Sequence, residues 1–423
     1  MNDLTKFDAW IKDVGPAALV VREHLVPVEG EDGVFFPATY AAQQGADRDK
    51  DKFQGGYNID LFPDGSNVCL IDSVGSQANR TEPIFALSEY SNLVPQIEVT
   101  FPEKGLRINL LNANHRAADA IIRCSPFEKP LRNAFLEILR GNSEPLAKIA
   151  PTSLVFGVWD SRDTSAKLPR LLSSTIRAHN IKVHTRSANF LIQMTIDLAK
   201  LDILPGADSK DGFANAISSK APGGVQLMPN GTIRRDATLG LAALRRLAVI
   251  ESDGTLSPDR TIALRRYILG LSLVALTAPQ ESYLRQGCNL VPDIEKPRSF
   301  KVVNLDGSRQ DAIVLHEEAK SFATLAAKAF VIGGNRAERF DATLAEKAAE
   351  GKPEKLKGEV VSLDATTNSF KLKLAKGGES VVTTNSTTKF LKGKDDADFD
   401  TVISVGAKLD VKIIADVAII VKK

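Results

Sequence analysis

The pattern of apolar residues changes once, near residue 350, and this change divides the chain. Before it, β-like runs alternate with helical patterns. After the breaker at 350–353, short alternating runs follow one another between turn residues: GEVVSLD, SFKLKL, ESVVTT, TKFL, TVISV, LDVKII and VAIIVK. Such regular spacing is typical of a small barrel. We therefore predict a first domain over 1–350 and a barrel-like all-β domain of about five to seven strands over 354–423.

The first domain mixes two periodicities. Between 68 and 187 the strand-like runs are VCLID, QIEVTF, LRINLL, SLVFGVW and IKVHTR, and the helical patterns are ANHRAADAIIR and PLRNAFLEILRG. Two further helical segments follow, DATLGLAALRRLAVI and DRTIALRRYILGLSLVALT, the second with Asp259 as the expected N-cap. This mixture predicts an α+β fold for the first domain.

The stretch CLIDSVGSQANRTE, residues 69–82, begins as an apolar strand and ends in a cluster of hydrogen-bonding side chains. Two interpretations compete for this cluster. It is either a loop that grips a ligand or a capped turn into a helix that begins near Thr81.

Residues 204–236 are rich in glycine and polar residues, and Asn230-Gly231 is a good candidate for a hairpin turn. A loop of this length inside a compact domain is usually functional or disordered.

Composition bounds the possible partners and the compartment. The 423 residues contain 54 Lys plus Arg against 52 Asp plus Glu, so the whole-chain charge neither favours nor excludes a polyanionic partner. Three widely spaced cysteines fit a reducing cytoplasm. The N-terminus lacks the basic-then-apolar order of a signal peptide, and the apolar run at 267–278 is too short to span a bilayer. We expect a cytoplasmic protein with no membrane partner.

Motifs for catalysis are missing from the sequence. There is no phosphate loop, no GxGxxG after a strand and no GxSxG elbow, and the three cysteines and five histidines show no metal-ligand spacing. His179 and His184 flank Lys182, which suggests either a metal-independent ribonuclease or, several times more often, structural histidines. We expect no enzyme, no cofactor and no metal.

Positive charge is concentrated in two stretches. Residues 157–190 carry six basic residues against two acidic ones, a local +4, and residues 233–270 carry seven arginines against four acids, a local +3. Such stretches suit a phosphate backbone, although each arginine has about even odds of a helix-surface ion pair instead. From these stretches we select Lys167, Arg234 and Arg235 as candidate RNA contacts.

Together, the 69–82 stretch, GVWDSRDTSAKLPRLLSSTIRAHNIKVHTRSANF, ALRRYILGLSLVALT and YLRQGCNLV resemble one family in order and spacing over roughly residues 10–335. The chain resembles the RAMP-superfamily backbone subunit of type I-G (formerly type I-U) CRISPR effector complexes, the Cascade complexes. The tail after Pro353 departs from that family. It resembles small bacterial β-barrel modules of unassigned role, and we expect it to contact target DNA or a neighbouring subunit.

The resemblance implies an RNA-recognition-motif (ferredoxin-like) core with insertions, shaped as a hand. Copies of such subunits form a helical filament along a CRISPR RNA and hold it for pairing with invading DNA, while large and guide-processing CRISPR subunits are further partners. It implies that the palm binding the guide contains Ser76, Gln77, Asn79, Arg80, Arg170, Arg177 and Arg186. It also implies a thumb-like hairpin, for which 204–235 is the candidate.

Two alternatives stay open beside this non-catalytic scaffold. Related backbone subunits cleave target RNA through a thumb aspartate, and Asp208 and Asp211 lie in the candidate thumb. The second alternative is a structural protein that self-associates without nucleic acid, through basic patches that meet acidic surfaces of neighbouring copies.

Overall fold

The chain forms two compact units, one comprising 1–123 and 127–338 and the other 124–126 and 339–423. The structure, a computed structural model, describes residues 3–46, 49, 51–161, 163–190, 216–350, 354–364, 369–375, 377–384, 388–393, 395–414 and 417–423. The sequence-based boundary at 350–353 lies after α10 (Ala342–Glu350), which the contacts assign to the second unit.

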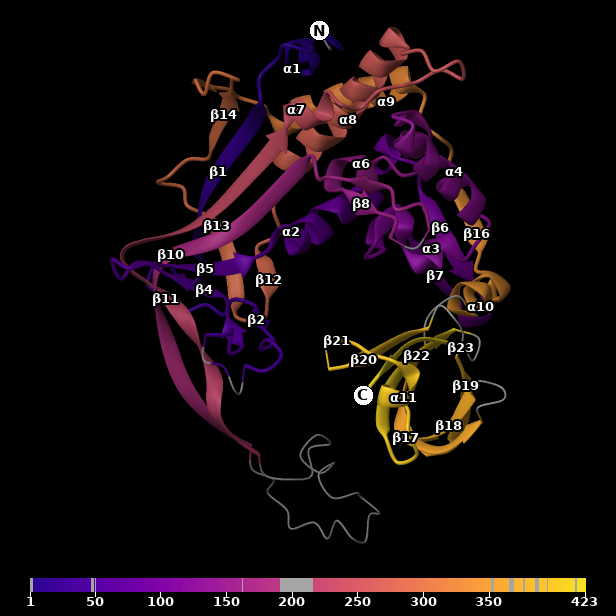
Figure 1. The fold of residues 1–423 in the computed structure, drawn as a ribbon. Helices are drawn as coiled ribbons and strands as arrows, with labels where there is room; N and C mark the ends of the chain where they lie inside the picture. The colour runs from indigo at the N-terminus through magenta and orange to yellow at the C-terminus, as the bar shows by residue number, and fades with distance from the viewer. Residues whose placement is uncertain are drawn as a thin grey trace. The chain divides into compact units, whose positions relative to one another are not determined.

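The larger unit is built on a nine-stranded sheet (Figure 1). Its main path runs in the order β12-β13-β1-β11-β10-β5-β4, and β14 and β15 join it through β1. The strand bounds are β1 (Ala18–Pro27), β4 (Ile59–Leu61), β5 (Asn67–Asp72), β10 (Leu172–Phe190), β11 (Ala216–Gly240), β12 (Tyr283–Arg285), β13 (Cys288–Pro292), β14 (Ser299–Val303) and β15 (Arg309–Asp311). The pairings that the structure gives within this sheet are antiparallel.

Strands β10 and β11 form one long antiparallel pair, from Leu172 opposite Leu239 to Phe190 opposite Ala216. Asn230-Gly231 lies inside β11, so the predicted hairpin turn is wrong. The residues form an irregularity between the pairs His179–Thr232 and Ile181–Leu227, where Asn230 has a φ of 63°. Of the candidate thumb, residues 204–215 lie outside the described residues, and 216–235 belong to β11.

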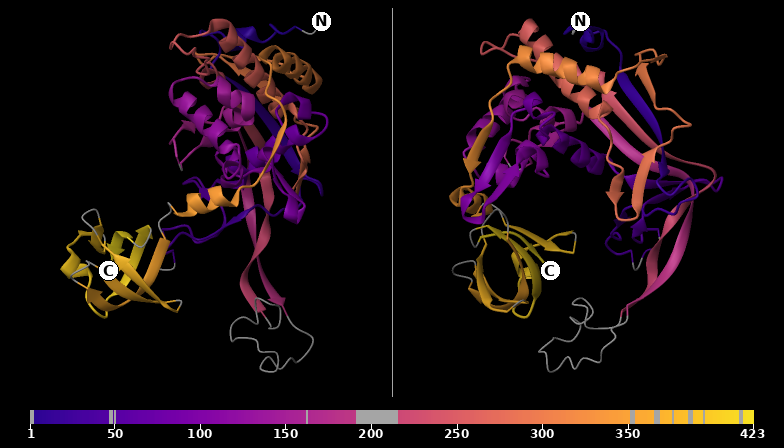
Figure 2. Two further views of the ribbon diagram at one scale, coloured as in Figure 1. Left: turned by 90° about the vertical axis from the view of Figure 1, so that its right-hand side faces the viewer. Right: turned by 180° about the vertical axis from the view of Figure 1, so that it is seen from behind.

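Helices cover one face of this sheet and leave the other without a covering helix in the described part of the chain (Figures 1 and 2). Helix α2 (Val74–Thr81) packs on β10, α7 (Leu241–Leu244) on β1, and α8 (Pro258–Thr277) on β11. The open face is therefore where side chains of this sheet meet solvent.

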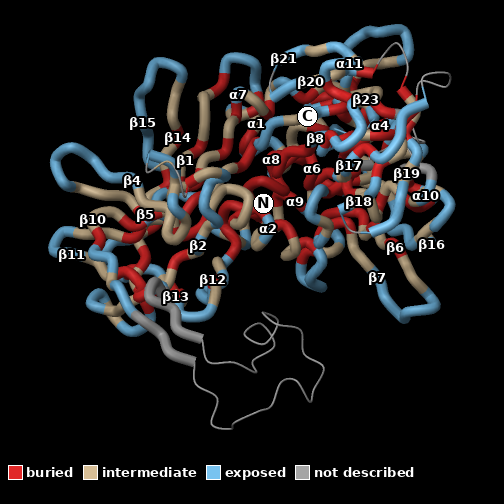
Figure 3. The backbone as a smooth tube through the Cα atoms, turned by 60° about the horizontal axis from the view of Figure 1, so that its bottom comes forward, coloured by how far each residue is buried: buried red, intermediate tan, exposed pale blue. Residues whose placement is uncertain are grey.

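Helix α8 is buried over its second half (Figure 3) and packs against α9 (His316–Phe330). The predicted cap is wrong by two residues: Ser257 is the N-cap, Pro258 takes the first helical position, and Asp259 lies in the first turn. No described helix has both the length and the apolar content needed to cross a bilayer.

The remaining elements complete the larger unit. The helices are α1 (Asp8–Ile11), α3 (Ala120–Arg123), α4 (Glu128–Leu139), α5 (Glu144–Ile149) and α6 (Thr152–Phe156). Two small sheets are two-stranded: β2 (Thr39–Tyr40) pairs with β3 (Gly56–Tyr57), and β8 (Val158–Trp159) pairs with β9 (Lys167–Leu168). A third small sheet consists of β6 (Ile97–Phe101) between β7 (Leu106–Asn109) and β16 (Arg336–Arg339). The mixed α+β class is confirmed.

Two segments differ in secondary structure from the prediction: one is helix instead of strand, and the other is strand instead of helix. SLVFGVW is mostly helix α6 followed by the short strand β8. DATLG continues β11, and only 241–244 are helical, because β11 is paired on both sides at this point. Pairing with two neighbours outweighs the modest differences in helix propensity along this segment.

The smaller unit contains a seven-stranded sheet in the order β19-β18-β17-β22-β23-β20-β21. Strand β19 also pairs with β23, which closes β17, β18, β19, β23 and β22 into a ring around an apolar core. The bounds are β17 (Glu354–Asp364), β18 (Ser369–Leu374), β19 (Glu379–Thr383), β20 (Lys389–Lys392), β21 (Asp395–Asp396), β22 (Lys408–Ile414) and β23 (Val417–Lys422).

Strand β18 approaches β17 so closely that position 358 of β17 must be glycine. A Cβ at Gly358 would lie 2.5 Å from the carbonyl oxygen of Lys373, so only glycine fits. One predicted strand of this unit is wrong, since TVISV begins in the short helix α11 (Phe399–Val402).

Candidate nucleic-acid interface

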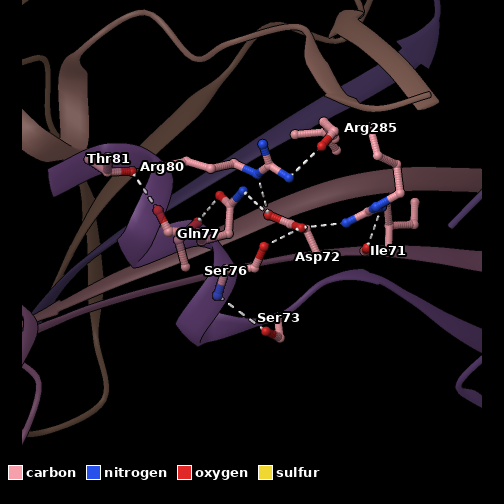
Figure 4. Close-up of polar contacts among 10 residues, drawn as sticks. Ile71, Asp72, Ser73, Ser76, Gln77, Arg80, Thr81 and Arg285 are labelled. Carbon is pink, nitrogen blue, oxygen red and sulfur yellow. Dashed lines mark hydrogen bonds and ion pairs between the residues drawn. The ribbon is translucent and has the colours of Figure 1, made fainter. Parts of the chain in front are cut away.

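The polar stretch that follows β5 is helix α2 itself (Figure 4). Ser73 caps the helix by accepting a hydrogen bond from the backbone N–H of Ser76 (3.2 Å). The helix ends at Thr81, so the interpretation that placed its start near Thr81 is wrong. The many hydrogen-bonding side chains have an internal purpose, because they surround one buried carboxylate.

That carboxylate is Asp72, the last residue of β5, whose side chain is 0% exposed. One oxygen accepts from Ser76 Oγ (2.7 Å) and Arg285 Nη2 (2.8 Å), and the other from Gln77 Nε2 (2.8 Å) and Arg80 Nε (3.2 Å). Ser76, Gln77 and Arg80 are thus brought together, and each makes an intramolecular contact. Asn79 points away from the network on the exposed side of α2.

Arg235 is also buried on the helix-covered side. Its side chain is 3% exposed, its Nε donates to Glu23 Oε2 (2.8 Å), and one Nη group has no partner among the described residues. Arg235, Gln77 and Arg80 line a cavity of about 520 Å³ together with apolar side chains and two glutamates. The acidic groups offset most of the positive charge there, so this cavity is a poor track for a polyanion.

Two further candidate RNA contacts, Arg177 and Arg234, lie on the open face of the sheet. Arg177 on β10 lies directly opposite Arg234 on β11, and Arg234 lies opposite His24 on β1. Directly opposite residues share a face, so these three side chains form one row across three strands. In the adjacent row Arg22 faces Asp236. Three arginines against one aspartate leave this part of the face with a charge of +2 when histidine is neutral.

Asp236 holds two of these arginines by one nitrogen each. Its two oxygens accept from Arg22 Nε and Arg234 Nε, both at 2.8 Å. Partial burial acts against ionisation, yet the hydrogen bonds from both arginines lower the pKa of Asp236. The Nη groups of both guanidinium groups have no partner among the described residues. Paired donors held in this way suit phosphate oxygens.

Two histidines lie beside these arginines: His24 in the row itself, and His179 two residues after Arg177 on β10. His24 Nδ1 and His179 Nε2 are buried and have no hydrogen-bond partner in the described part of the structure. Burial and the nearby positive charge of Arg234 lower the pKa of both side chains. At neutral pH both are uncharged, so the arginines alone supply the positive charge of this row.

The depressed pKa values predict a loss of stability in acid. Below about pH 6.5 the unfolded chain binds protons that folded His24 and His179 do not, so the free energy of unfolding falls as the pH falls. Urea unfolding between about pH 7.5 and about pH 5.5 should give a flatter profile for the His24→Gln, His179→Gln variant than for the natural protein. Parallel profiles for the two proteins would contradict this assignment.

The remaining predicted contacts lie apart from these groups. Lys167 is exposed on β9, with its Nζ 5.4 Å from the centroid of the Trp159 ring. Arg170 and Arg186 are exposed and form no side-chain hydrogen bond or ion pair with the described residues, so both remain predictions as RNA contacts. The three arginines of α8 in the second basic stretch are all ion-paired: Arg260, Arg265 and Arg266 contact carboxylates.

Sequence reasoning missed four residues of these groups: Arg22, Asp72, Asp236 and Arg285. The alternation in AALVVREHLVP gives a signal for Arg22, because Leu19, Val21 and Leu25 are buried on one face of the strand and Arg22 falls on the opposite face. Arg285 gives no such signal, since it lies 213 residues from its carboxylate partner.

The described part of the chain offers no cluster of metal ligands, and it does not include the predicted thumb aspartates. Within the described residues, no group of three or more His, Cys, Asp or Glu could hold a metal ion. Asp208 and Asp211 lie outside the described residues. The three cysteines are free and buried.

The fold and this face define an α+β protein whose main sheet presents arginines on an open surface. Residues 19–183 match the family described as CRISPR-associated protein GSU0053. The matched stretch runs from β1 through the first part of β10 and contains both Arg22 and Arg177. No curated protein matches the chain. The similarity supports a CRISPR-associated protein without specifying its role in a complex.

Proposed function

We propose that this protein is a non-catalytic backbone subunit of a type I-G CRISPR effector complex. Copies of it assemble along the CRISPR RNA and present the guide for pairing with invading DNA. Arg22, Arg177 and Arg234 lie together on the open sheet face, and we call these three residues the arginine row. This row carries the proposal, in a chain that is similar over 19–183 to a CRISPR-associated family.

The connectivity of the sheet supports an RNA-recognition-motif core. Strands β1 and β11 are central neighbours, with β10 beside β11 and with β13 and β14 beside β1. A connection that contains helices joins β1 to β10, a hairpin joins β10 to β11, and α7 and α8 lie between β11 and β13. This is the β-α-β-β-α-β pattern of ferredoxin-like folds, in which RNA-recognition motifs bind RNA on the open face of the sheet.

The charge on that face suits sequence-independent binding of a guide. Arg22, Arg177 and Arg234 offer guanidinium donors, and the hydroxyl of buried Thr175 accepts from Arg177 Nη1 (2.6 Å) and so holds that guanidinium group. Donors of this kind fix a phosphate backbone without reading bases. A scaffold that must hold guides of any sequence needs this type of contact.

Purification from cells tests the proposal. The protein is co-expressed with a CRISPR array and the guide-processing subunit, and the absorbance ratio and particle size are measured before and after RNase treatment. We expect large particles that contain RNA of uniform guide length and that shrink when the RNA is digested. A nucleic-acid-free particle of unchanged size would overturn the proposal and favour a self-associating structural protein.

A further inference from the structure

The outward side of the small barrel carries a concentration of lysines that the sheet-face proposal does not use. The lysine face consists of five outward lysines of β17, β22 and β23, namely Lys355, Lys357, Lys408, Lys412 and Lys422. Glu359, Asp364 and Asp410 are the exposed acids of these strands among the described residues. Five lysines against three acids give a charge of +2.

Edge protection does not explain all of these lysines. Exposed strand edges often carry lysine to block pairing with other chains. Strand β17 pairs with β18 only from Gly358 onward, so Lys355 lies in a part of β17 that pairs with β22 alone. Lys412 lies where β22 is paired with both β17 and β23, so it has no free edge to protect.

The arrangement of charge also costs stability. Lys355 lies directly opposite Lys412, and like charges at directly opposite positions destabilise a sheet. The next row is better balanced, since Asp410 lies between Lys357 and Lys422 and its carboxylate is 2.9 Å from Lys357 Nζ. No ion pair with a described residue is formed by Lys355, Lys408, Lys412 or Lys422.

An open hollow of about 630 Å³ adjoins this face. Its walls include Lys357, Lys408 and Lys422 together with two further lysines, Lys373 and Lys423. The apolar side chains among its described lining residues are small in number, namely Leu374, Ala375 and Leu409, and none of these lining residues is aromatic. A protein partner would need an apolar centre to the contact, which the described lining of this hollow does not supply.

We propose that the lysine face binds the phosphate backbone of a nucleic acid strand, as a second site that is separate from the arginine row of the large sheet. The uncompensated Lys355–Lys412 pair is relieved when phosphates lie over it. Without aromatic side chains for base stacking, binding is independent of sequence and strongly dependent on salt.

The test uses the full chain with Lys355→Gln and Lys412→Gln, in a background where Arg22, Arg177 and Arg234 are replaced by Gln. This background separates the barrel from the sheet face. Labelled single-stranded RNA, single-stranded DNA and duplex DNA of equal length and unrelated sequence are titrated at several salt concentrations. The double replacement should weaken binding about tenfold and reduce the log–log salt slope by about 1.4 for single strands and about 1.8 for duplex.

A matched control removes the same charge from the same unit. Lys371 and Lys389 are paired with Glu379 (2.5 Å) and Asp396 (3.0 Å), and their replacement by Gln should leave affinity within about twofold. Equal effects of both double variants on every probe would overturn the proposal. The probe that loses most affinity identifies RNA, single-stranded DNA or duplex as the ligand.

A separate measurement checks that the variants are folded. Because Lys355→Gln and Lys412→Gln remove a repulsion, the melting temperature should not fall. If it does, the Lys408→Gln, Lys422→Gln variant repeats the test with residues that face carboxylates. Unchanged affinity in that variant would also overturn the proposal.

Discussion

Replacing Arg22, Arg177 and Arg234 together with Gln will weaken guide-RNA binding by about 100- to 1,000-fold at moderate salt. The three guanidinium groups lie in neighbouring rows of one open face, and two of them keep their Nη groups free of any described partner. Each lost phosphate contact removes about 0.7 from the log–log salt slope of a single strand, so the slope should fall by about 2. Fluorescence anisotropy with guide RNA at several salt concentrations measures both quantities.

The control for this prediction removes the same charge elsewhere in the larger unit. Arg107, Arg132 and Arg140 are well exposed, and each contacts a carboxylate. Their replacement by Gln should change affinity by about threefold or less, because screened charges act weakly beyond about 10 Å. Equal losses in both triple variants would remove the arginine row as the RNA site, even if the protein still binds its guide.

Arg170 offers a cleaner single test of the predicted palm than Arg80 does. Arg170 is exposed and forms no side-chain hydrogen bond or ion pair with the described residues, whereas Arg80 contacts Asp72 and the carbonyl oxygen of Leu284. A loss of RNA binding in Arg80→Ala would mix a lost phosphate contact with a disturbed network. The same change at Arg170 reports on RNA alone.

The sequence pattern correctly predicted the strands and helices that depend mainly on residues close to one another in the chain. The run VCLID is β5 and IKVHTR lies in β10, because alternation and β-branched residues act within one strand. The helix of residues 128–139 ends before Gly141, whose φ of 87° favours glycine. The breaker at 350–353 separates α10 from the first barrel strand.

Features that depend on distant partners were missed. The stretch after β5 was expected to bind a ligand or to lead into a later helix, since nothing local shows that Asp72 accepts from Ser76, Gln77 and an arginine more than 200 residues away. Arg177 and Arg234 were both selected from sequence, but their position in one row follows from strand register. Register is fixed by the hairpin and by the burial of alternate residues.

Replacing Asp72 with Asn will lower the free energy of unfolding of the larger unit by about 3–5 kcal/mol. The carboxylate is fully buried and accepts from two arginines, so the change leaves both guanidinium groups without their shared anion. The new amide also places a donor against groups that only donate. Urea unfolding followed by tryptophan fluorescence measures this unit alone, because Trp10 and Trp159 both belong to it.

Two further variants set the scale for this loss. Asp13 is 85% exposed and pairs with Arg265 at 3.0 Å, so Asp13→Asn should cost about 1 kcal/mol or less. Arg285→Gln leaves Asp72 with Arg80, Ser76 and Gln77, and its cost should fall between the other two. A cost for Asp72→Asn no greater than that for Asp13→Asn would mean that the network does not hold α2 against the sheet. Ser76, Gln77 and Arg80 would then be available to a ligand, as the sequence first suggested.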